Sequence, residues 1–337
     1  MLLFEYIGIS TMLYNFDNCM QDYNHVYGGH SAQKMGIIFN NGYYMLKYPN
    51  NLKEKGIKNC SLSYSNSPYS EYIGSHIFDI LGIPVHETLL GTRKNHIVVA
   101  CRNFCDEDER LMMFSEIKTT FEPSDELANS YSATEGGSVE LNEILQILEE
   151  HPLFSFDRDS VKRRFWDMFV IDAYIGNPDR NNENWGIITG KNGKKRLAPV
   201  YDNGNSLCDK WDDKKTDFFL NCSKKEQIDM AFSIPSIYKD GDKRVFPINF
   251  IEKRKNYDCD EAMLRIFPKI INSQNKIKTM IEEAPSLDTE SKAFYLGILN
   301  LRFTLGLLPA FLKIYKEHYG NDYFLADNIS DLIEGDN

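Results

Sequence analysis

The hydrophobic periodicity of this chain changes near residues 101–104. Before this point, short runs of β-branched and aromatic residues predict strands and one packed helix, and after it the patterns are mainly helical. A chain of 337 residues is long enough for two domains or for one fold with two lobes. The change therefore predicts an α+β fold with a small β-rich lobe over residues 1–102, a larger α-helical lobe over residues 103–325, and an acidic tail over residues 326–337.

The first lobe is predicted to contain two strand pairs and a helix. Asn41-Gly42 separates two strand-like runs, and this dipeptide favours a hairpin because both turn residues must tolerate positive φ angles. A helix with apolar residues at helical spacing follows a polar loop, and a second strand pair follows the helix. The predicted elements are strands within residues 35–48, a helix from Pro68 to Gly82, and strands over residues 85–90 and 97–101.

The second lobe is predicted to consist of helices with one short strand pair among them. Several aromatic residues within residues 161–175 indicate a helix of the core. The predicted elements are helices over residues 141–148 and 161–175, strands over residues 186–189 and 196–200, and helices over residues 262–281 and 292–316.

The charge and the cysteine content exclude several classes of protein. The 38 Lys and Arg residues against 49 Asp and Glu residues give a net charge of −11, which argues against direct binding of nucleic acid. The 7 cysteines are scattered without a CxxC pair, which favours reduced thiols and a cytoplasmic setting. The N-terminus lacks a basic region, and the apolar stretch from Phe303 to Leu312 is too short to cross a bilayer, so we expect neither a signal peptide nor a membrane partner.

A polar loop carries the strongest functional signal, between a predicted helix that ends at Gly176 and a predicted strand that begins at Gly186. It contains Asp179 and Asn184 in the pattern D-x-x-x-x-N, the spacing that protein kinases use for a catalytic base and a metal ligand. A carboxylate can accept the proton of an attacking hydroxyl group, and a neutral amide oxygen can hold Mg²⁺ without repelling phosphate. A capped turn is the alternative interpretation of this loop taken by itself.

Three further side chains occur in the order that a kinase requires. Lys47 lies on the second predicted strand, where a kinase lysine pairs with the phosphates of ATP, and Glu71 at the start of the predicted helix can form an ion pair with it. Asp202 ends a predicted strand shortly before Gly204, which fits the metal-binding aspartate of a kinase. Taken singly, these residues also fit a solvent-facing strand lysine, a first-turn acid and a strand-ending turn.

A short glycine-containing loop precedes the first hairpin. Gly28 and Gly29 can offer backbone N–H groups to phosphate, and an ordinary turn explains the same residues. Ser31 lies in this loop and is a candidate for autophosphorylation on that ground alone. The combined order of glycine loop, strand lysine, helix glutamate and two aspartate motifs is more specific than any one of these features.

From roughly residue 25 to residue 283, the sequence resembles the HipA-type kinase family, and most closely its short, cell-translocating members. The family's catalytic loop reads N-x-D-R-H-x-x-N and corresponds here to residues 177–184, with Asn181 in the place of the usual histidine. The other stretches that carry the resemblance are residues 44–49, 70–72, 87–92, 97–101 and 165–170.

The resemblance implies a bilobal protein-kinase-like fold with ATP in the cleft between the lobes. The site residues that it implies are the catalytic base Asp179, the Mg²⁺ ligands Asn184 and Asp202, the phosphate-pairing Lys47 with its partner Glu71, and an adenine-binding hinge whose backbone includes Cys101 and Asn103.

The activity that the resemblance implies is ATP- and Mg²⁺-dependent phosphorylation of serine or threonine in a protein substrate, with autophosphorylation. A lipid or small-molecule kinase, and a toxin-module pseudokinase that acts by binding, are the alternatives. An antitoxin partner is left open, and so is export as an effector without a standard signal peptide.

Overall fold

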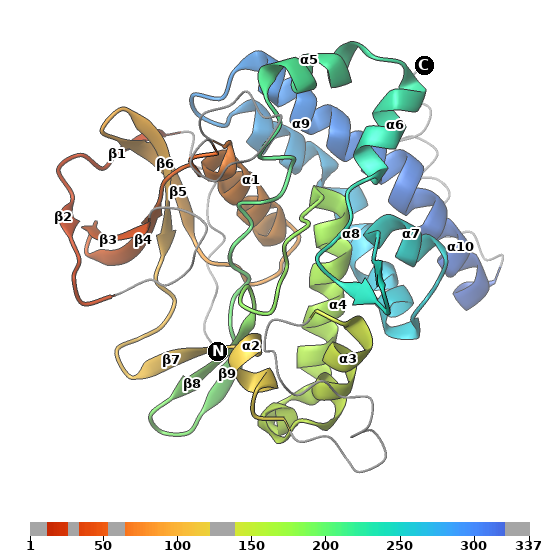
Figure 1. Ribbon diagram of the computed structural model, residues 1–337, viewed down its shortest axis with the longest axis horizontal. Coiled ribbons are helices and arrows are strands. Elements are labelled where there is room, and N and C mark those ends of the chain that lie inside the picture. Colours follow the sequence, from red (N-terminus) through yellow and green to blue (C-terminus); the bar gives the residue numbers. More distant parts are fainter. Residues whose placement is uncertain (1–11, 26–33, 53–64, 122–138, 321–337) are drawn as a thin grey trace.

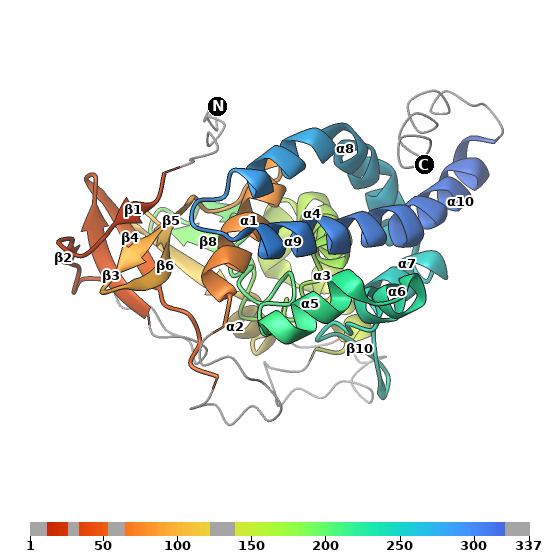
Figure 2. The ribbon, with the colours of Figure 1, turned by 90° about the horizontal axis from the view of Figure 1, so that it is seen from above.

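A six-stranded sheet forms one end of the molecule and helices form most of the rest (Figure 1), a separation that is also visible from above in Figure 2. The computed structural model describes residues 12–25, 34–52, 65–121 and 139–320. The mixed architecture confirms the predicted α+β class. In their spatial order, the strands of the sheet are β1 (Tyr14–Asn15), β5 (Thr88–Arg93), β6 (His96–Arg102), β4 (Gly42–Lys47), β3 (Lys34–Phe39) and β2 (Met20–Gln21).

The β3–β4 hairpin turns one residue earlier than predicted. Asn40 and Asn41 form the two-residue turn with φ angles of 45° and 60°, and Gly42 lies in β4 opposite Phe39. Asparagine tolerates the left-handed region because its short polar side chain can hydrogen-bond locally. The two asparagines therefore supply both positive φ angles, and the turn does not need the glycine.

Helix α1 (Ser67–Ile80) confirms the predicted helix and lies between the sheet and the helical region (Figure 1). It packs against β5 and β6 and also against α8 (Tyr257–Glu282), so most of its residues are buried. Gly82 follows its last turn with a φ angle of 71°. Because α1 is covered on two sides, its polar residues face other protein groups, and Glu71 is 0% exposed.

A second sheet of three strands has the order β7-β8-β9. The sequence predicted the pair β8 (Gly186–Gly190) and β9 (Lys195–Leu197), but not β7 (Glu109–Met113), which pairs with β8. The residues of β7 have no alternation of apolar and polar side chains, so they gave no strand signal.

Two predicted strands, over residues 85–90 and 196–200, do not extend to Val85 and Val200. These two valines instead pair with each other in an isolated parallel bridge. The N–H of Val200 donates to the backbone oxygen of Pro84 over 2.8 Å. The bridge ties the segment before β5 to the segment after β9.

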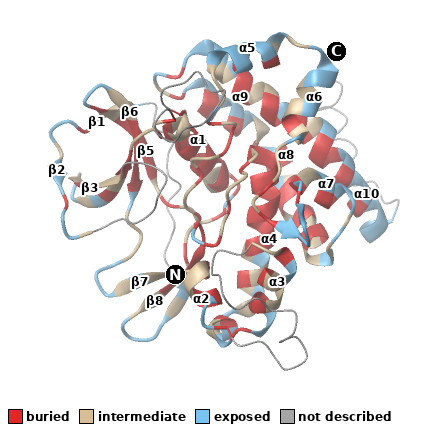
Figure 3. Ribbon diagram, viewed as in Figure 1, coloured by how far each residue is buried: buried red, intermediate tan, exposed pale blue. Residues whose placement is uncertain are grey.

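Helices α4 and α8 pack together at the centre of the helical region, where Figure 3 shows mostly buried residues. In α4 (Arg158–Ile175), the ring of Trp166 stacks on that of Phe250, with ring centroids 6.0 Å apart. The predicted helices over residues 161–175 and 262–281 are confirmed. The remaining helices are α2 (Phe114–Lys118), α3 (Leu141–Glu150), η1 (Pro152–Phe156), α5 (Asp213–Asn221), α6 (Lys224–Phe232), α7 (Pro247–Glu252), α9 (Thr289–Leu301) and α10 (Leu308–Tyr319), and a short hairpin joins β10 (Lys239–Asp240) to β11 (Lys243–Arg244).

The helix predicted over residues 292–316 is interrupted by a π-helical segment, η2 (Arg302–Leu307), between α9 and α10. In the described part of the chain, the stretch Thr289–Tyr319 is the one helix that is long and apolar enough to cross a membrane, by length and composition. Its most apolar window is 61% buried inside the molecule, as is usual for a core helix.

Candidate active site

The polar loop between α4 and β8 begins with a glycine in the left-handed region. Gly176 caps α4 with a φ angle of 65°, and a Cβ atom at this position would lie 2.3 Å from Nη2 of Arg302. Glycine is the residue that adopts this conformation without strain and leaves room for the arginine. The loop that it opens carries Asp179 and Asn184.

Asp179 is held by amide groups on both of its carboxylate oxygens. Asn181 Nδ2 donates to Oδ1 over 3.1 Å, and Asn205 Nδ2 donates to Oδ2 over 2.7 Å. Burial raises the pKa of the Asp179 carboxyl group; the Asn181 hydrogen bond opposes this rise, and the charge of Asp202 adds to it. A carboxylate with a raised pKa and a fixed orientation is suited to accept a proton. Asn181, which replaces the usual family histidine, therefore braces Asp179 directly.

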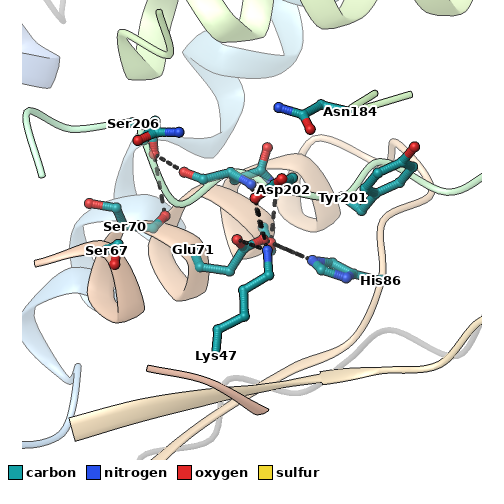
Figure 4. Close-up of polar contacts among 12 residues, drawn as sticks. Lys47, Ser67, Ser70, Glu71, His86, Asn184, Tyr201, Asp202 and Ser206 are labelled. Atoms are coloured by element: carbon teal, nitrogen blue, oxygen red, sulfur yellow. Dashed lines mark hydrogen bonds and ion pairs between the residues drawn. The ribbon is translucent and has the colours of Figure 1, made fainter. Parts of the chain in front are cut away.

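Asn184 is fixed by a hydrogen bond within the same loop. Its Nδ2 donates to the backbone oxygen of Asp179 over 2.6 Å, so Oδ1 is the acceptor atom that this amide presents. Figure 4 shows the amide oxygen of Asn184 pointing towards Asp202. An amide oxygen and a carboxylate that face the same space form a set of donor atoms that fits Mg²⁺.

Lys47, Glu71 and Asp202 meet at the boundary between β4, α1 and the segment after β9 (Figure 4). Lys47 Nζ lies 2.6 Å from Glu71 Oε2 and 2.9 Å from Asp202 Oδ1. Lys47 is 7% exposed, so its ammonium group depends on these carboxylates for compensation. The structure thus brings together three of the residues that the sequence predicted for the site.

The charges of this cluster shift each other's pKa values. Burial alone would lower the pKa of Lys47, but the charges of Asp202 and Glu71 hold it well above its ordinary value. Burial alone would raise the pKa of Glu71, but the charge of Lys47 and the hydrogen bond with His86 hold it well below its ordinary value. The ammonium group and the Glu71 carboxylate are therefore both ionised over a wide pH range.

The Glu71 carboxylate has two further partners that the sequence did not predict. His86 Nε2 lies 3.0 Å from Glu71 Oε1, and the N–H of Asn203 donates to the same oxygen over 3.0 Å. A carboxylate only accepts, so we assign the His86 proton to Nε2. The position of Asn203 directly after Asp202 is the only sequence signal that pointed to either residue.

Arg180 holds the loop of Asp179 and Asn184 in place through several hydrogen bonds. Its guanidinium group donates to both carboxylate oxygens of Asp172, each over 2.9 Å, and to Asn203 Oδ1 over 2.6 Å. It also donates to the backbone oxygen of Tyr201 over 2.5 Å. Arg180 is 2% exposed and connects α4, the catalytic loop and the Asp202 segment through planar, charge-assisted hydrogen bonds.

Asp202 has a φ angle of 60°, which is uncommon for a residue other than glycine. Two residues later, a Cβ atom on Gly204 would lie 3.2 Å from Glu71 Oε2, closer than most side-chain contacts. Strained backbone of this kind gathers at ligand-binding sites, where the surrounding contacts hold it. The Asp-x-Gly pattern thus has a steric reason as well as a chemical one.

The segment expected to receive adenine lies at the end of β6. Cys101 is 1% exposed and pairs with Met45 of β4 in the sheet. The N–H of Asn103 donates to the backbone oxygen of Tyr43 over 2.8 Å, and its side-chain amide donates to the backbone oxygen of Cys105 over 3.1 Å. The backbone N–H of Asn103 and one N–H of its side-chain amide are therefore used within the protein, and its contribution to a nucleotide site remains a prediction.

Cys101 also belongs to a buried group with Glu71 and His86, whose potential metal-binding atoms lie within 4.8 Å of one another. Lys47 Nζ contacts the same Glu71 carboxylate and would repel a cation placed there. The Asn184 and Asp202 oxygens are the better donor set for Mg²⁺, because this ion prefers oxygen ligands and the buried group offers a thiol and an imidazole beside its carboxylate.

A pocket of about 330 Å³ opens beside Lys47. Lys34 adds a second positive charge to it, and burial together with the charge of Lys47 lowers the pKa of Lys34. Two lysines beside a carboxylate suit a phosphate group that shares a metal ion with that carboxylate. The predicted phosphate-binding residues Gly28, Gly29 and Ser31 lie outside the described residues. The pocket is lined by Lys34, Lys47, Tyr48, Asn50, Ser67, Glu71, Asp202, Gly204 and Asn205.

Known proteins resemble this chain in sequence and in structure. The sequence model of the HipA-like C-terminal domain matches residues 33–281. The serine/threonine-protein kinase CtkA of Helicobacter pylori is 33% identical over 317 residues, which cover 91% of this chain and 92% of that protein. The crystal structure of a Helicobacter pylori proinflammatory kinase CtkA superposes with a TM-score of 0.80 at 31% identity and covers 90% of this chain and 99% of that chain.

A more distant likeness is to a chain of the Shewanella oneidensis MR-1 complex of HipA, HipB and operator DNA. It superposes with a TM-score of 0.47 at 10% identity and covers 86% of this chain and 66% of that chain. A likeness at this level carries no argument about partners or activity.

Proposed function

The chain belongs to the family of proteins with a HipA-like C-terminal domain and is a kinase of the serine/threonine type, and we propose that it transfers the γ-phosphoryl group of ATP to a protein hydroxyl group with the help of Mg²⁺. The contact of Lys47 with Glu71 and Asp202 carries this proposal. It joins the strand, the helix and the loop from which a kinase builds its phosphate site.

On the phosphate side of the site, Lys47 donates to the phosphates of ATP while Glu71 keeps its ammonium group in place. Asn184 Oδ1 and the Asp202 carboxylate would hold Mg²⁺, which would neutralise charge on the phosphates. Asp202 would then face both the metal ion and Lys47, whose Nζ lies 2.9 Å from Asp202 Oδ1.

On the acceptor side, Asp179 takes the proton of the substrate hydroxyl group as that oxygen forms a bond to the γ-phosphorus. The bond between this phosphorus and the β–γ bridging oxygen breaks, and ADP leaves with its electron pair. Asn181 and Asn205 hold both oxygens of Asp179, so the base is oriented before the hydroxyl group arrives. Positioning and electrostatic stabilisation supply most of the rate in phosphoryl transfer.

The proposal includes autophosphorylation. Ser31 is the first candidate acceptor, since it precedes Lys34 closely in the chain and Lys34 lines the pocket beside Lys47. We place the reaction in the cytoplasm and expect a protein segment as the acceptor. Phosphorylation of a lipid or a small molecule in place of protein would contradict this part of the proposal.

Asp179→Asn tests the chemical step, because it keeps the shape of the side chain and removes the base. After incubation with Mg²⁺ and ATP, mass spectrometry should find phosphoserine or phosphothreonine on the wild-type protein. The variant should lose about 10²- to 10⁴-fold in transfer rate and keep its affinity for ATP in calorimetry.

The control is Asp217→Asn, which changes an exposed carboxylate that accepts from Asn221 on the surface of α5 and should leave transfer unchanged. Transfer at the wild-type rate by Asp179→Asn would refute the role of Asp179. A wild-type protein that binds ATP and phosphorylates no protein would refute the proposed function.

A further inference from the structure

A second cavity, with about 290 Å³ of empty space that is partly open to solvent, lies beside the start of the loop that carries Asp179, among α4, α6, α7 and η2. Helices α4, α6 and α7 all pack against η2. Its walls are partly apolar, with Ala231, Phe232 and Ile248 among them. The guanidinium group of Arg302, from the π-helical segment, also lines it. The guanidinium group therefore faces a cavity with both apolar and polar walls, and Asp172 and Asn177 are among the polar ones.

Arg302 is buried and poorly compensated. It is 1% exposed. Among the residues that the structure describes, its acceptors are the backbone oxygens of Ala231 and Tyr174, at 3.3 and 3.5 Å, and Cys208 Sγ at 3.9 Å. These distances are long for hydrogen bonds from a guanidinium group. A buried charge with only weak neutral partners destabilises the folded protein unless another charge compensates it.

The acidic groups near Arg302 do not supply that charge. Burial raises the pKa of Cys208, so its sulfur is a neutral thiol at pH 7. The carboxylate of Asp172, which also lines the cavity, accepts two hydrogen bonds from Arg180 and one from Asn177 Nδ2. Arg180 thus neutralises Asp172, and within residues 12–25, 34–52, 65–121 and 139–320 Arg302 has no anionic partner.

We propose that this cavity binds a small monovalent anion, held by the guanidinium group of Arg302. The N–H groups of a guanidinium donate to anions in one plane, and apolar walls favour weakly hydrated anions such as chloride or bromide over sulfate. The proposal does not depend on the proposed kinase activity.

The anion site has a direct connection to the catalytic loop. A Cβ atom on Gly176 would overlap the Arg302 guanidinium group, which shows how closely the arginine packs against the residue that opens the loop. An anion that fixes Arg302 also fixes the backbone from which Asp179 extends. Binding should therefore stabilise the folded protein.

Crystals of the full chain grown or soaked in sodium bromide test the site directly. Bromide should give an anomalous peak within hydrogen-bond distance of the Arg302 guanidinium group. In solution, the melting temperature should rise by about 2 °C with bromide and saturate, relative to sodium gluconate at the same ionic strength. Sodium sulfate should not reproduce the saturable shift.

Two variants and a control make the solution measurement specific. Arg302→Gln should abolish the saturable shift, and so should Ala231→Leu, which fills the cavity and keeps the arginine. Arg110→Gln changes an arginine whose side chain is 70% exposed and should retain the shift. A bromide-soaked crystal with no anomalous peak at Arg302, or an unchanged shift in Arg302→Gln, would overturn the proposal. The wild-type crystal decides the question if a variant fails to fold.

Discussion

At the scale of single residues, Asn203 connects three parts of the site through its backbone and its side chain. Its backbone N–H donates to Glu71, its Nδ2 donates to Ser75 Oγ over 3.0 Å, and its Oδ1 accepts from Arg180 over 2.6 Å. It is 0% exposed. In many kinases a phenylalanine follows the metal-binding aspartate and packs against its surroundings, whereas here a buried amide connects α1 to the catalytic loop through hydrogen bonds.

Asn203→Leu tests this connection with a side chain of similar shape. The substitution leaves the Ser75 hydroxyl group and one Arg180 N–H group buried without their amide partner, and each such loss costs about 1–3 kcal/mol. We expect the free energy of unfolding, measured in urea, to fall by about 2–4 kcal/mol, together with a large loss of phosphoryl transfer. Asn221→Leu, at the exposed end of α5, should change stability by less than about 0.5 kcal/mol. Equal stability of the two variants would contradict the role of Asn203.

At the scale of elements, the position of α1 depends on a close approach at Gly74. A Cβ atom there would lie 2.9 Å from Cβ of Asn203 and 3.1 Å from Oγ of Ser206. This contact sets how near α1, and with it Glu71, comes to the Asp202 segment. Gly297 in α9 is a natural comparison, because a Cβ atom there would make an ordinary contact at 3.6 Å with the ring of Phe219.

Gly74→Ala should therefore push α1 away from the Asp202 segment and separate Glu71 from Asn203. Overpacking of this kind costs about 1–3 kcal/mol, and we expect transfer activity to fall with stability. Gly297→Ala should instead raise stability by about 0.5–1 kcal/mol, since alanine is the better helix former. Thermal unfolding and the transfer assay measure both effects. An active, fully stable Gly74→Ala variant would show that α1 can move without consequence.

The sequence predicted those elements that carry a local signal. Helix α1 has apolar residues at helical spacing, α4 has several aromatic residues, and the β3–β4 hairpin has a turn signal between two strand-like runs. Strands β1 and β2 have two residues each, which is too short for any periodic signal. The π-helical segment in the last long helix was not predicted either, because its six residues are fewer than the window over which a helical period is recognised.

The residues of the site also divide into those that the sequence predicted and those that it did not. Lys47, Glu71 and Asp202 could be predicted because a known spacing and order pointed to them. His86 and Asn205 could not, since their contacts join segments far apart in the chain, and neither residue type is unusual where it stands. Sequence motifs thus predict the groups proposed to perform the chemistry, while the groups that orient them require the fold.

At the scale of the whole molecule, one buried cluster ties the sheet to the helical region. Lys47 and Asp202 are 155 positions apart in the chain and lie 2.9 Å apart in space. The Val85–Val200 bridge joins the same two parts through the backbone. The ionic contact is therefore expected to stabilise the whole fold in addition to building the site, and its contribution should depend on pH.

Glu71→Gln isolates this contribution, because it keeps the side-chain shape and removes the charge opposite Lys47. The pKa of Glu71 lies below its ordinary value of 4.5 in the folded protein, so its charge contributes stability in full above about pH 4.5 and loses it as the pH falls further. Breaking a buried ion pair costs about 3–5 kcal/mol, and we expect about 3 kcal/mol here at pH 7 because Asp202 still faces Lys47. In urea unfolding, the difference in free energy of unfolding between wild type and Glu71→Gln should decrease as the pH is lowered from about 5 to about 3.5.

The matched control for this measurement is Glu149→Gln. Glu149 is paired with Lys162 over 2.7 Å, but its side chain is 59% exposed, so the solvent screens the pair and its loss should cost less than about 1 kcal/mol. The difference in free energy of unfolding between the two variants is then due to burial and not to the number of ion pairs. The buried cluster does not stabilise the molecule through its charge if both substitutions lower the free energy of unfolding equally at pH 7. The same conclusion follows if the difference between wild type and Glu71→Gln stays constant down to about pH 3.5.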